Sequence, residues 1–222
     1  MATFDTPPTP GSGFPVANKV LNGTSANESF TSGSGNDTID GGGGTDTVIF
    51  TGNRADHTVT KTATGWTVSS TADGTDTVTN VERLKFADST FALDVSGTAG
   101  QAYRIYQAAF NRAPDSSGLG FWISAMDQGY SLNAVAQGFV DSPEFKTLYG
   151  TSPTNAQIVS KMYDNVLHRT PDQGGYDFWL GVLNRGDATV AQVLAGMGES
   201  AENQAALVGV IGNGFSFIPS GG

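Results

Sequence analysis

The sequence predicts an α+β fold: a short N-terminal parallel β-roll with an antiparallel β extension, followed by an all-α domain of two pseudo-repeated helical modules. Three observations predict it. Two nine-residue units with one pattern of Gly, Asp and aliphatic residues follow each other between residues 32 and 49. Strand-like alternation then runs from 56 to 95, and a segment with helical period occurs twice after residue 97.

The changes of period also divide the chain into four parts. The first is rich in Pro, Thr and Gly and is expected to be an extended arm. The boundary between the second and third parts lies where the spacing of apolar residues changes from every second residue, typical of strands, to about every 3.6 residues, typical of helices. The parts are the arm (1–22), the β-roll and its β cap (23–96), the helical domain (97–204, with modules at about 99–150 and 156–204) and a C-terminal tail (205–222).

The composition excludes several classes of function. The net charge of −10 lacks the basic footprint that nucleic-acid binding needs. The absence of cysteine excludes disulfides and thiolate chemistry. No stretch reads as a cleavable signal peptide or as a membrane span. Only 14% of residues are charged, and such a surface suits either a protein whose faces are covered by neighbours or a Gly- and Thr-rich secreted scaffold.

The two nine-residue units read SGSGNDTID and GGGGTDTVI, each with Gly at positions 2 and 4, Asp at 6 and an aliphatic residue at 8. Gly permits the positive φ angles and close backbone approach that aim turn carbonyls inward, and Asp supplies hard carboxylate oxygens. If one coil takes two units, turns on the same side of the roll are separated by two units. A metal site then needs the turn of one unit and the turn two units later.

Counting by nine in both directions finds weaker units. Residues 23–31 carry Glu28 in the Asp position, so this turn can stack on the turn that holds Asp46, two units later. Residues 50–58 offer Asp37 a weaker companion turn, in which only Gly52 and Asn53 fit. A flexible Gly-rich linker is the alternative, which two tandem units in register disfavour. The candidate metal ligands are Gly23, Glu28, Gly33, Gly35, Asp37, Gly42, Gly44 and Asp46.

This pattern resembles the calcium-binding nonapeptide repeat G-G-x-G-x-D-x-U-x of RTX-type (hemolysin-type) secreted proteins. The resemblance implies Ca²⁺ as the cofactor, with one or two ions expected. It also implies export by a type I secretion machine that reads an uncleaved C-terminal signal. The tail LVGVIGNGFSFIPSGG is typical of such a signal, and a strand or arm that docks on the body or on a neighbour is the alternative, compatible with it.

After the roll, residues 56–95 read as short antiparallel strands that cap it. Trp66 in this segment is expected to be a buried cap residue, and a sugar-stacking platform is the alternative.

The helical half contains the same sequence pattern twice. The spacing between matched residues is constant up to a single inserted residue and is one residue longer after it. Each copy holds an R-x-P-D turn, in which Pro is expected at the first helical position and Asp in the first turn, followed by an FW helix. The matched pairs are Tyr106/Tyr163, Arg112/Arg169, Pro114/Pro171, Asp115/Asp172, Gly118/Gly175, Phe121/Phe178, Trp122/Trp179, Gly129/Gly186, Val135/Val193, Gly138/Gly196, Ser142/Ser200 and Glu144/Glu202.

The repeated pattern resembles a helical domain of unknown function found in secreted RTX and S-layer-like bacterial proteins, which is similar to phycobilisome linker domains. The resemblance implies a helical module and an assembly context, with no known chemistry.

The function expected from these features is that of a secreted, calcium-binding structural protein that self-assembles, as S-layer or filament subunits do. Its location would be the bacterial cell surface or the extracellular matrix, and its partners copies of itself. A monomeric adhesion or carbohydrate-binding module, with a cell-surface glycan as partner, is the second hypothesis. A hydrolase is the third and is disfavoured, because His57 and His168 lie outside any catalytic motif and no enzyme is expected.

Overall fold

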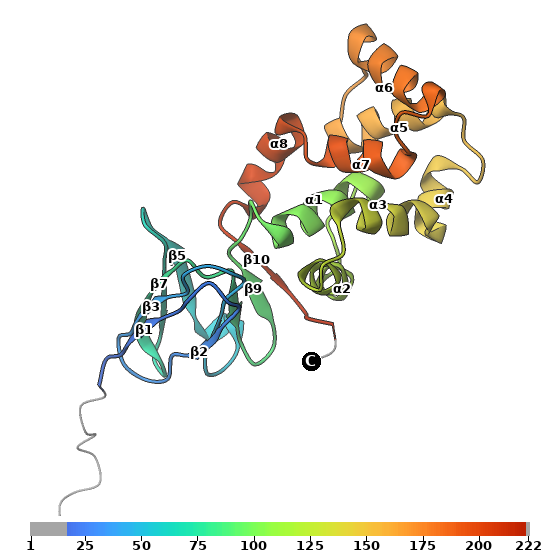
Figure 1. Cartoon of the computed structure of the whole chain (residues 1–222). Coiled ribbons are helices and arrows are strands. Elements are labelled where there is room, and N and C mark those ends of the chain that lie inside the picture. Colours follow the sequence, from blue (N-terminus) through green and yellow to red (C-terminus); the bar gives the residue numbers. More distant parts are fainter. Residues whose placement is uncertain (1–16, 221–222) are drawn as a thin grey trace, which may run out of the picture.

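The computed structural model describes residues 17–220 and contains strands followed by helices, so the predicted α+β class is confirmed. Figure 1 shows an elongated molecule with the β half at one end and the helical half at the other. The 3-10 helix η1 spans Arg54–Asp56. The strands are β1 (Val20–Asn22), β2 (Ser29–Thr31), β3 (Thr38–Asp40), β4 (Thr47–Ile49), β5 (Thr58–Lys61), β6 (Trp66–Ser70), β7 (Gly74–Thr79), β8 (Arg83–Lys85), β9 (Thr90–Ala92) and β10 (Phe215–Phe217).

The strands form two five-stranded sheets, in the orders β1-β3-β7-β6-β5 and β10-β9-β8-β4-β2. Strands β1, β3 and β7 are parallel to one another in the first sheet, as are β2, β4 and β8 in the second. The pairs β5–β6, β6–β7, β8–β9 and β9–β10 are antiparallel. The first four short strands therefore alternate between the two sheets.

The predicted parallel β-roll with a separate antiparallel extension is wrong, because both sheets are mixed. The chain turns back after β6 and again after β8, so antiparallel strands join the same sheets as the parallel ones instead of forming a separate cap. The strand register explains why counting in steps of nine residues did not find the strand that follows β3 in its sheet. Val20 pairs with Thr38, two units later, but Thr38 pairs with Thr77 only after the β5–β6 hairpin has been inserted.

The core of the β half is built by inward-facing residues of short strands. Because side chains alternate along a strand, a three-residue strand with one buried face buries its middle residue. Ile39, Val48 and Leu84 occupy such middle positions, and together with Val78 of β7 they are 0% exposed. Trp66 packs against the same core and is 8% exposed, as expected for a buried residue.

Eight helices follow among the described residues, four in each copy of the repeat. Residues expected near the helix starts act as N-caps: Asp115 Oδ1 accepts from the backbone N–H of Gly118 (2.7 Å) and Asp172 Oδ1 from that of Gly175 (2.8 Å). Pro114 and Pro171 therefore precede the caps and do not occupy the first helical position. The helices are α1 (Thr98–Phe110), α2 (Ser116–Asp127), α3 (Leu132–Asp141), α4 (Pro143–Tyr149), α5 (Asn155–Leu167), α6 (Gln173–Arg185), α7 (Val190–Gly198) and α8 (Ala201–Ile211).

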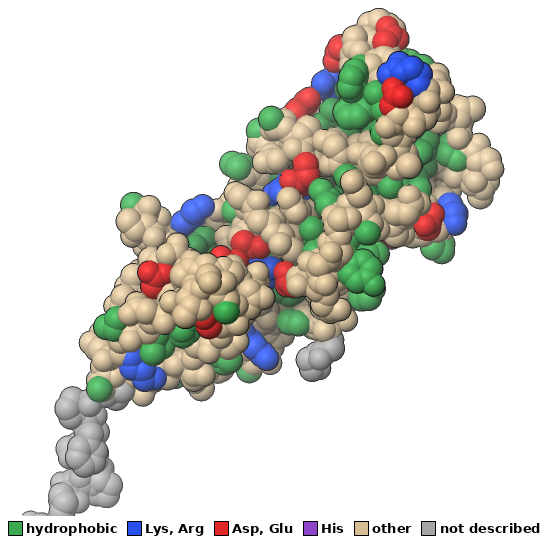
Figure 2. Space-filling model, in the orientation of Figure 1, with side chains coloured by type: hydrophobic (Ala, Val, Ile, Leu, Met, Phe, Trp, Pro, Cys, Tyr) green, Lys and Arg blue, Asp and Glu red, His purple; other side chains and the backbone are tan. Residues whose placement is uncertain are grey.

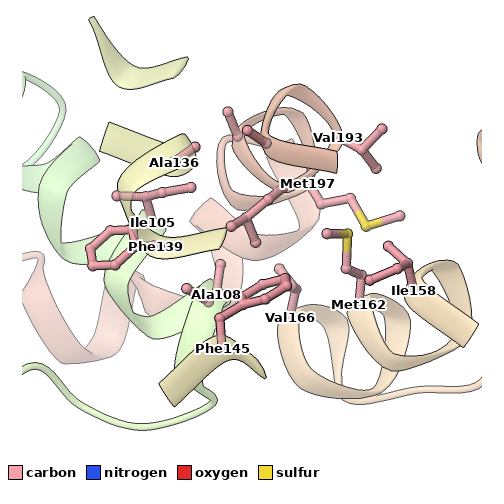
Figure 3. Close-up of a cluster of buried hydrophobic side chains, with 14 of the residues drawn as sticks. Ile105, Ala108, Ala136, Phe139, Phe145, Ile158, Met162, Val166, Val193 and Met197 are labelled. Atoms are coloured by element: carbon pink, nitrogen blue, oxygen red, sulfur yellow. The ribbon is translucent and has the colours of Figure 1, made fainter. Parts of the chain in front are cut away.

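The two modules share one apolar core, to which equivalent helices contribute side by side. Helix α1 packs against α5, its equivalent in the second copy, and α3 packs against α7. Figure 3 shows Ile105 and Ala108 of α1 with Met162 and Val166 of α5 in this core. This arrangement leaves the two FW helices, α2 and α6, on different sides of the helical half (Figure 1).

The two halves meet where the β9–β10 edge covers the first helical module. Phe217 of β10 is 4% exposed and packs with Ala92, Leu119 and Ile123. An ion pair joins Arg83 of β8 to Asp94, and the Arg83 guanidinium also reaches Asp127 of α2 at 3.4 Å. Residues 215–217 of the tail are thus a strand that docks on the body.

Candidate metal centre

The Gly- and Asp-containing turns lie in two stacks, one for each of the two sheets. In the first stack, the turn at 33–37 lies between residues 17–19 and the turn at 73–76. In the second, the turn at 41–46 lies between the turn at 23–28 and residues 80–82. The predicted spacing of two units therefore holds for the first step of each stack.

Carboxylates link each turn to the next within a stack. In the first stack, Oδ1 of Asp37 accepts from the backbone N–H of Lys19, and the backbone N–H of Asp37 donates to Oδ1 of Asp76, both at 2.7 Å. In the second, the N–H of Glu28 donates to Oδ1 of Asp46, whose own N–H donates to Oε2 of Glu82, both at 2.8 Å. One oxygen of each central Asp is thus used for stacking.

In three of the buried Asp residues, the second carboxylate oxygen has no hydrogen-bond partner among the described residues. These atoms are Oδ2 of Asp37, Asp46 and Asp76, and the three residues are 1%, 0% and 0% exposed. Buried carboxylate oxygens are almost always hydrogen-bonded or bound to a cation, because desolvating an ion without compensation costs on the order of several kcal/mol. Two stacks with the same kind of unpaired oxygen therefore match the donor set of a hard cation.

Backbone carbonyls crowd the same turns, and glycine makes this possible. Gly44 has φ of 113°, and a Cβ there would lie 2.4 Å from the carbonyl oxygen of Ala26. Gly74 has φ of 90°, and a Cβ there would lie 2.1 Å from the carbonyl oxygen of Gly35. Any other residue would be strained and would clash, so glycine is what lets the backbone of one turn lie this close to the carbonyl oxygens of the next.

Burial changes the protonation of these carboxylates. It raises the pKa of Asp76 to about 6, with the charges of Asp37 and Asp73 acting in the same direction. Burial likewise raises the pKa of Asp46. The pKa of Glu28 is lowered instead, because Thr24 donates to its carboxylate from the side chain and from the backbone. A cation between the turns would favour the ionised form of Asp46 and Asp76.

The structure brings together the candidate ligands predicted in residues 23–46, but it changes one partner. The turn opposite Asp37 is formed by Gly74 and Asp76, not by residues 50–58, where Asn53 begins a 3-10 helix. Sequence reasoning missed Asp76 and Glu82. A signal for Asp76 was present, because the string G-T-D-T-V occurs at both 44–48 and 74–78.

Neither histidine is one of the candidate oxygen ligands, although His57 contacts the turn at 73–76 through Asp73. His57 is buried, with Nδ1 2.9 Å from the carbonyl oxygen of Asn53 and Nε2 2.8 Å from Oδ2 of Asp73. His168 is the C-cap of α5, with φ of 51°. Within residues 17–220, no three His, Cys, Asp or Glu side chains gather closely enough to hold a metal by themselves, so carbonyls would have to complete any site.

Comparison with known proteins identifies the helical half alone. Residues 99–149 and 136–207 each match the family described as domain of unknown function DUF4214, which agrees with the predicted helical domain of unknown function. No curated protein and no solved structure matches the chain. In the described part of the chain, every helix is too short or too polar to cross a bilayer.

Proposed function

We propose that this protein is a secreted calcium-binding structural protein of the RTX type, in which Ca²⁺ binds between stacked turns and supports self-assembly outside the cell. The observation that carries the calcium part is the set of unpaired, buried Oδ2 atoms of Asp37, Asp46 and Asp76. Oxygen-only ligands from carboxylates and carbonyls suit Ca²⁺, which takes six to eight of them in flexible geometry.

The first proposed site lies in the stack that holds Asp37 and Asp76. Each of these carboxylates has one free oxygen, and the carbonyl of Gly35 approaches the neighbouring turn at Gly74. Two carboxylates would neutralise the ion. Their mutual repulsion, which contributes to the raised pKa of Asp76, would be removed by it.

The second proposed site lies between the turns at 23–28 and 41–46. Asp46 has a free oxygen here, whereas both oxygens of Glu28 accept hydrogen bonds from Thr24. Calcium would have to compete with Thr24 for Glu28. The second site is therefore expected to be the weaker one.

Calcium outside the cell would couple binding to folding. Sites with a dissociation constant of roughly 10⁻⁴–10⁻³ M fill in extracellular fluid and stay empty in the cytosol. At about ten times that constant, one ion adds roughly 1.4 kcal/mol to stability. A chain that is less stable inside the cell and more stable outside suits export through a narrow channel.

A calcium titration followed by isothermal calorimetry tests the proposed sites. Asp76→Asn is expected to weaken the tighter site by roughly tenfold or more, because it removes one of two charged ligands. Asp177→Asn, on the exposed face of α6, serves as the matched control and should bind as the unaltered chain does. Absence of any calcium heat in the unaltered protein would contradict the proposal.

The self-assembly part is supported by features of the surface. Charged side chains are few and scattered on the face shown in Figure 2. Large apolar side chains are exposed on the helical half, among them Phe121, Phe178 and Val208 at 52%, 60% and 68%. Light scattering during the same titration tests this part, and particles that grow with calcium are the expected result.

A further inference from the structure

The two helical modules differ in whether the groove beside their FW helix is covered. In the second module the groove lies between α5 and α6 and is lined by Ala156, Gln157, Ser160, Lys161 and Tyr176. We call it the α5–α6 groove. The offset that aligns Tyr106 with Tyr163 places Ala99, Gly100, Tyr103, Arg104 and Leu119 at the equivalent positions of the first module.

In the first module the β half fills this groove. Ala99 and Leu119 are 0% and 2% exposed, under Phe217 of β10 and Ala92 of β9. Tyr103 packs against Phe215, with ring centroids 5.1 Å apart. In the second module Gln157, Ser160 and Lys161 are exposed and Ala156 and Tyr176 are half-buried. No described residue of the β half covers them.

The β half has a matching surface at its other end, which no residue among 17–220 covers. Strands β1 and β2 are edge strands of the two sheets and the first strands of the two stacks of turns, and we call them the free sheet end. Val20 is 71% exposed, and Leu21 and Phe30 are only half-buried although they pack on the β core. Figure 1 shows β9 and β10 beside α2, with β1 on the side away from the helices and α6 at the opposite end of the molecule.

We infer that the α5–α6 groove of one copy receives the free sheet end of a second copy. The β half would then be covered by its own first module at β9–β10 and by a neighbour's second module at β1–β2. The pairing is head-to-tail, so each bound copy exposes a further groove and a further sheet end, and the contact does not close on itself. An open chain of subunits follows.

The docking cannot copy the internal contact atom for atom. At Gly120 of α2, the carbonyl of Ile218 approaches so closely that a Cβ would lie 1.8 Å from it. The equivalent residue of α6 is Asp177, whose side chain keeps a backbone farther away. The groove therefore suits side chains that reach down from a sheet edge, such as Val20, and both surfaces are largely uncharged. This inference rests on the self-assembly proposed above and names its contact surfaces.

Charge substitutions at the two surfaces test the inference. Ser160→Glu in the groove and Val20→Glu on the sheet end should each leave a monomer in size-exclusion chromatography with light scattering, under calcium conditions where the unaltered chain forms particles. Gln137→Glu, at an exposed position of α3, is the control and should still assemble. Calcium calorimetry on every variant verifies that folding and metal binding are intact.

Mixing the variants gives the decisive measurement. The Ser160→Glu variant has an unaltered free sheet end, and the Val20→Glu variant has an unaltered α5–α6 groove. A mixture of the two should therefore form dimers but nothing larger than dimers. Because the chain has no cysteine, a disulfide between Ser160→Cys on one copy and Val20→Cys on another reports the same contact directly. A variant without residues 1–16 should still assemble, and loss of assembly would assign the groove to that segment instead.

Two further results would overturn the inference in distinguishable ways. Particles that persist in both charge variants would refute these contact surfaces and leave self-assembly standing. A monomeric unaltered chain that binds calcium would refute both the contact and the proposed assembly, but not the metal sites.

Discussion

At the scale of single residues, the proposed calcium sites depend on buried carboxylates. Asp37, Asp46 and Asp76 each use one oxygen to hold the neighbouring turn and leave the other unpaired. In the proposed sites, a proton and a cation would therefore compete for the same unpaired oxygen. A proton can satisfy the free oxygen when no cation is present.

The pH dependence of stability is therefore expected to reverse sign with calcium. The pKa of Asp76 rises from its ordinary value of 3.8 to about 6 on folding. Its contribution to stability is fully present below pH 3.8 and is lost as the pH rises through 6. In a chelator, the melting temperature should fall between about pH 4 and pH 6.5, and with calcium it should rise, because the metal requires the ionised form.

Asp76→Asn is the control for this prediction. Its amide does not titrate, so the decrease in chelator should be smaller than in the unaltered chain. An equal decrease in both proteins, measured by scanning calorimetry, would assign the effect to other groups, of which Asp46 also has a raised pKa.

Sequence reasoning found part of this site. It placed Glu28 opposite Asp46, because the intact repeat fixes their spacing at two units, and the structure pairs them. It missed Asp76, because an inserted hairpin separates Thr38 from its parallel partner Thr77. A fixed period cannot reveal an insertion, whereas a search for the repeated string G-T-D-T-V would have done so.

At the scale of elements, the R-x-P-D turn shows how one motif serves two helices. Arg112 forms a two-pronged contact with Glu144 (2.8 and 3.1 Å), and Arg169 does the same with Glu202 (2.6 and 3.0 Å). Arg169 also donates to Asp172 of its own turn at 3.4 Å, whereas Arg112 and Asp115 are 3.9 Å apart. The Asp is used mainly as the N-cap of the next helix.

The two caps are expected to differ in strength. Asp115 caps α2 and also accepts from the hydroxyl of Tyr106 at 2.6 Å, which lowers its pKa to about 2. Asp172 caps α6, and its pKa is lowered mainly by the N–H of Gly175. Asp172→Ala should lower the urea midpoint of unfolding, because the helix loses its cap. Asp115→Ala should lower it further, since the hydrogen bond from Tyr106 is lost as well.

Urea unfolding of the full chain in calcium measures both decreases. Serine at either position is the conservative control, because it retains the capping oxygen and should recover most of the loss. Equal decreases for the two alanine variants would show that the Tyr106 contact contributes nothing.

At the scale of the whole molecule, the junction between the halves depends on a strand from the C-terminal tail. β10 pairs with β9 and places Phe217 against Ala92, Leu119 and Ile123. The alternatives for the tail were a secretion signal and a docking strand. The docking strand is present, and the signal stays a prediction. Such a contact between residues 92 and 215 is set by tertiary packing and could not be predicted from local pattern.

Removing the Phe217 side chain should destabilise the junction. Phe217→Ala leaves a cavity in a buried cluster and is expected to cost about 3–5 kcal/mol. Ile218→Ala is the control, because this neighbour is 50% exposed and should cost much less. Hydrogen exchange of the α2 and β9 amides locates the effect, and protection that remains unchanged in both elements would contradict it.

The β5–β6 hairpin, which enters the chain between two stacked turns, shows that these turns need not be evenly spaced along the sequence. Their contacts are made by backbone and carboxylate atoms outside the hairpin, whose tip at Ala63 and Thr64 is exposed. A guest peptide spliced between these two residues would extend into solvent and leave the oxygen-rich turns in place. In the proposed assembly, the hairpin tip would thus be a position at which each subunit could carry an added peptide.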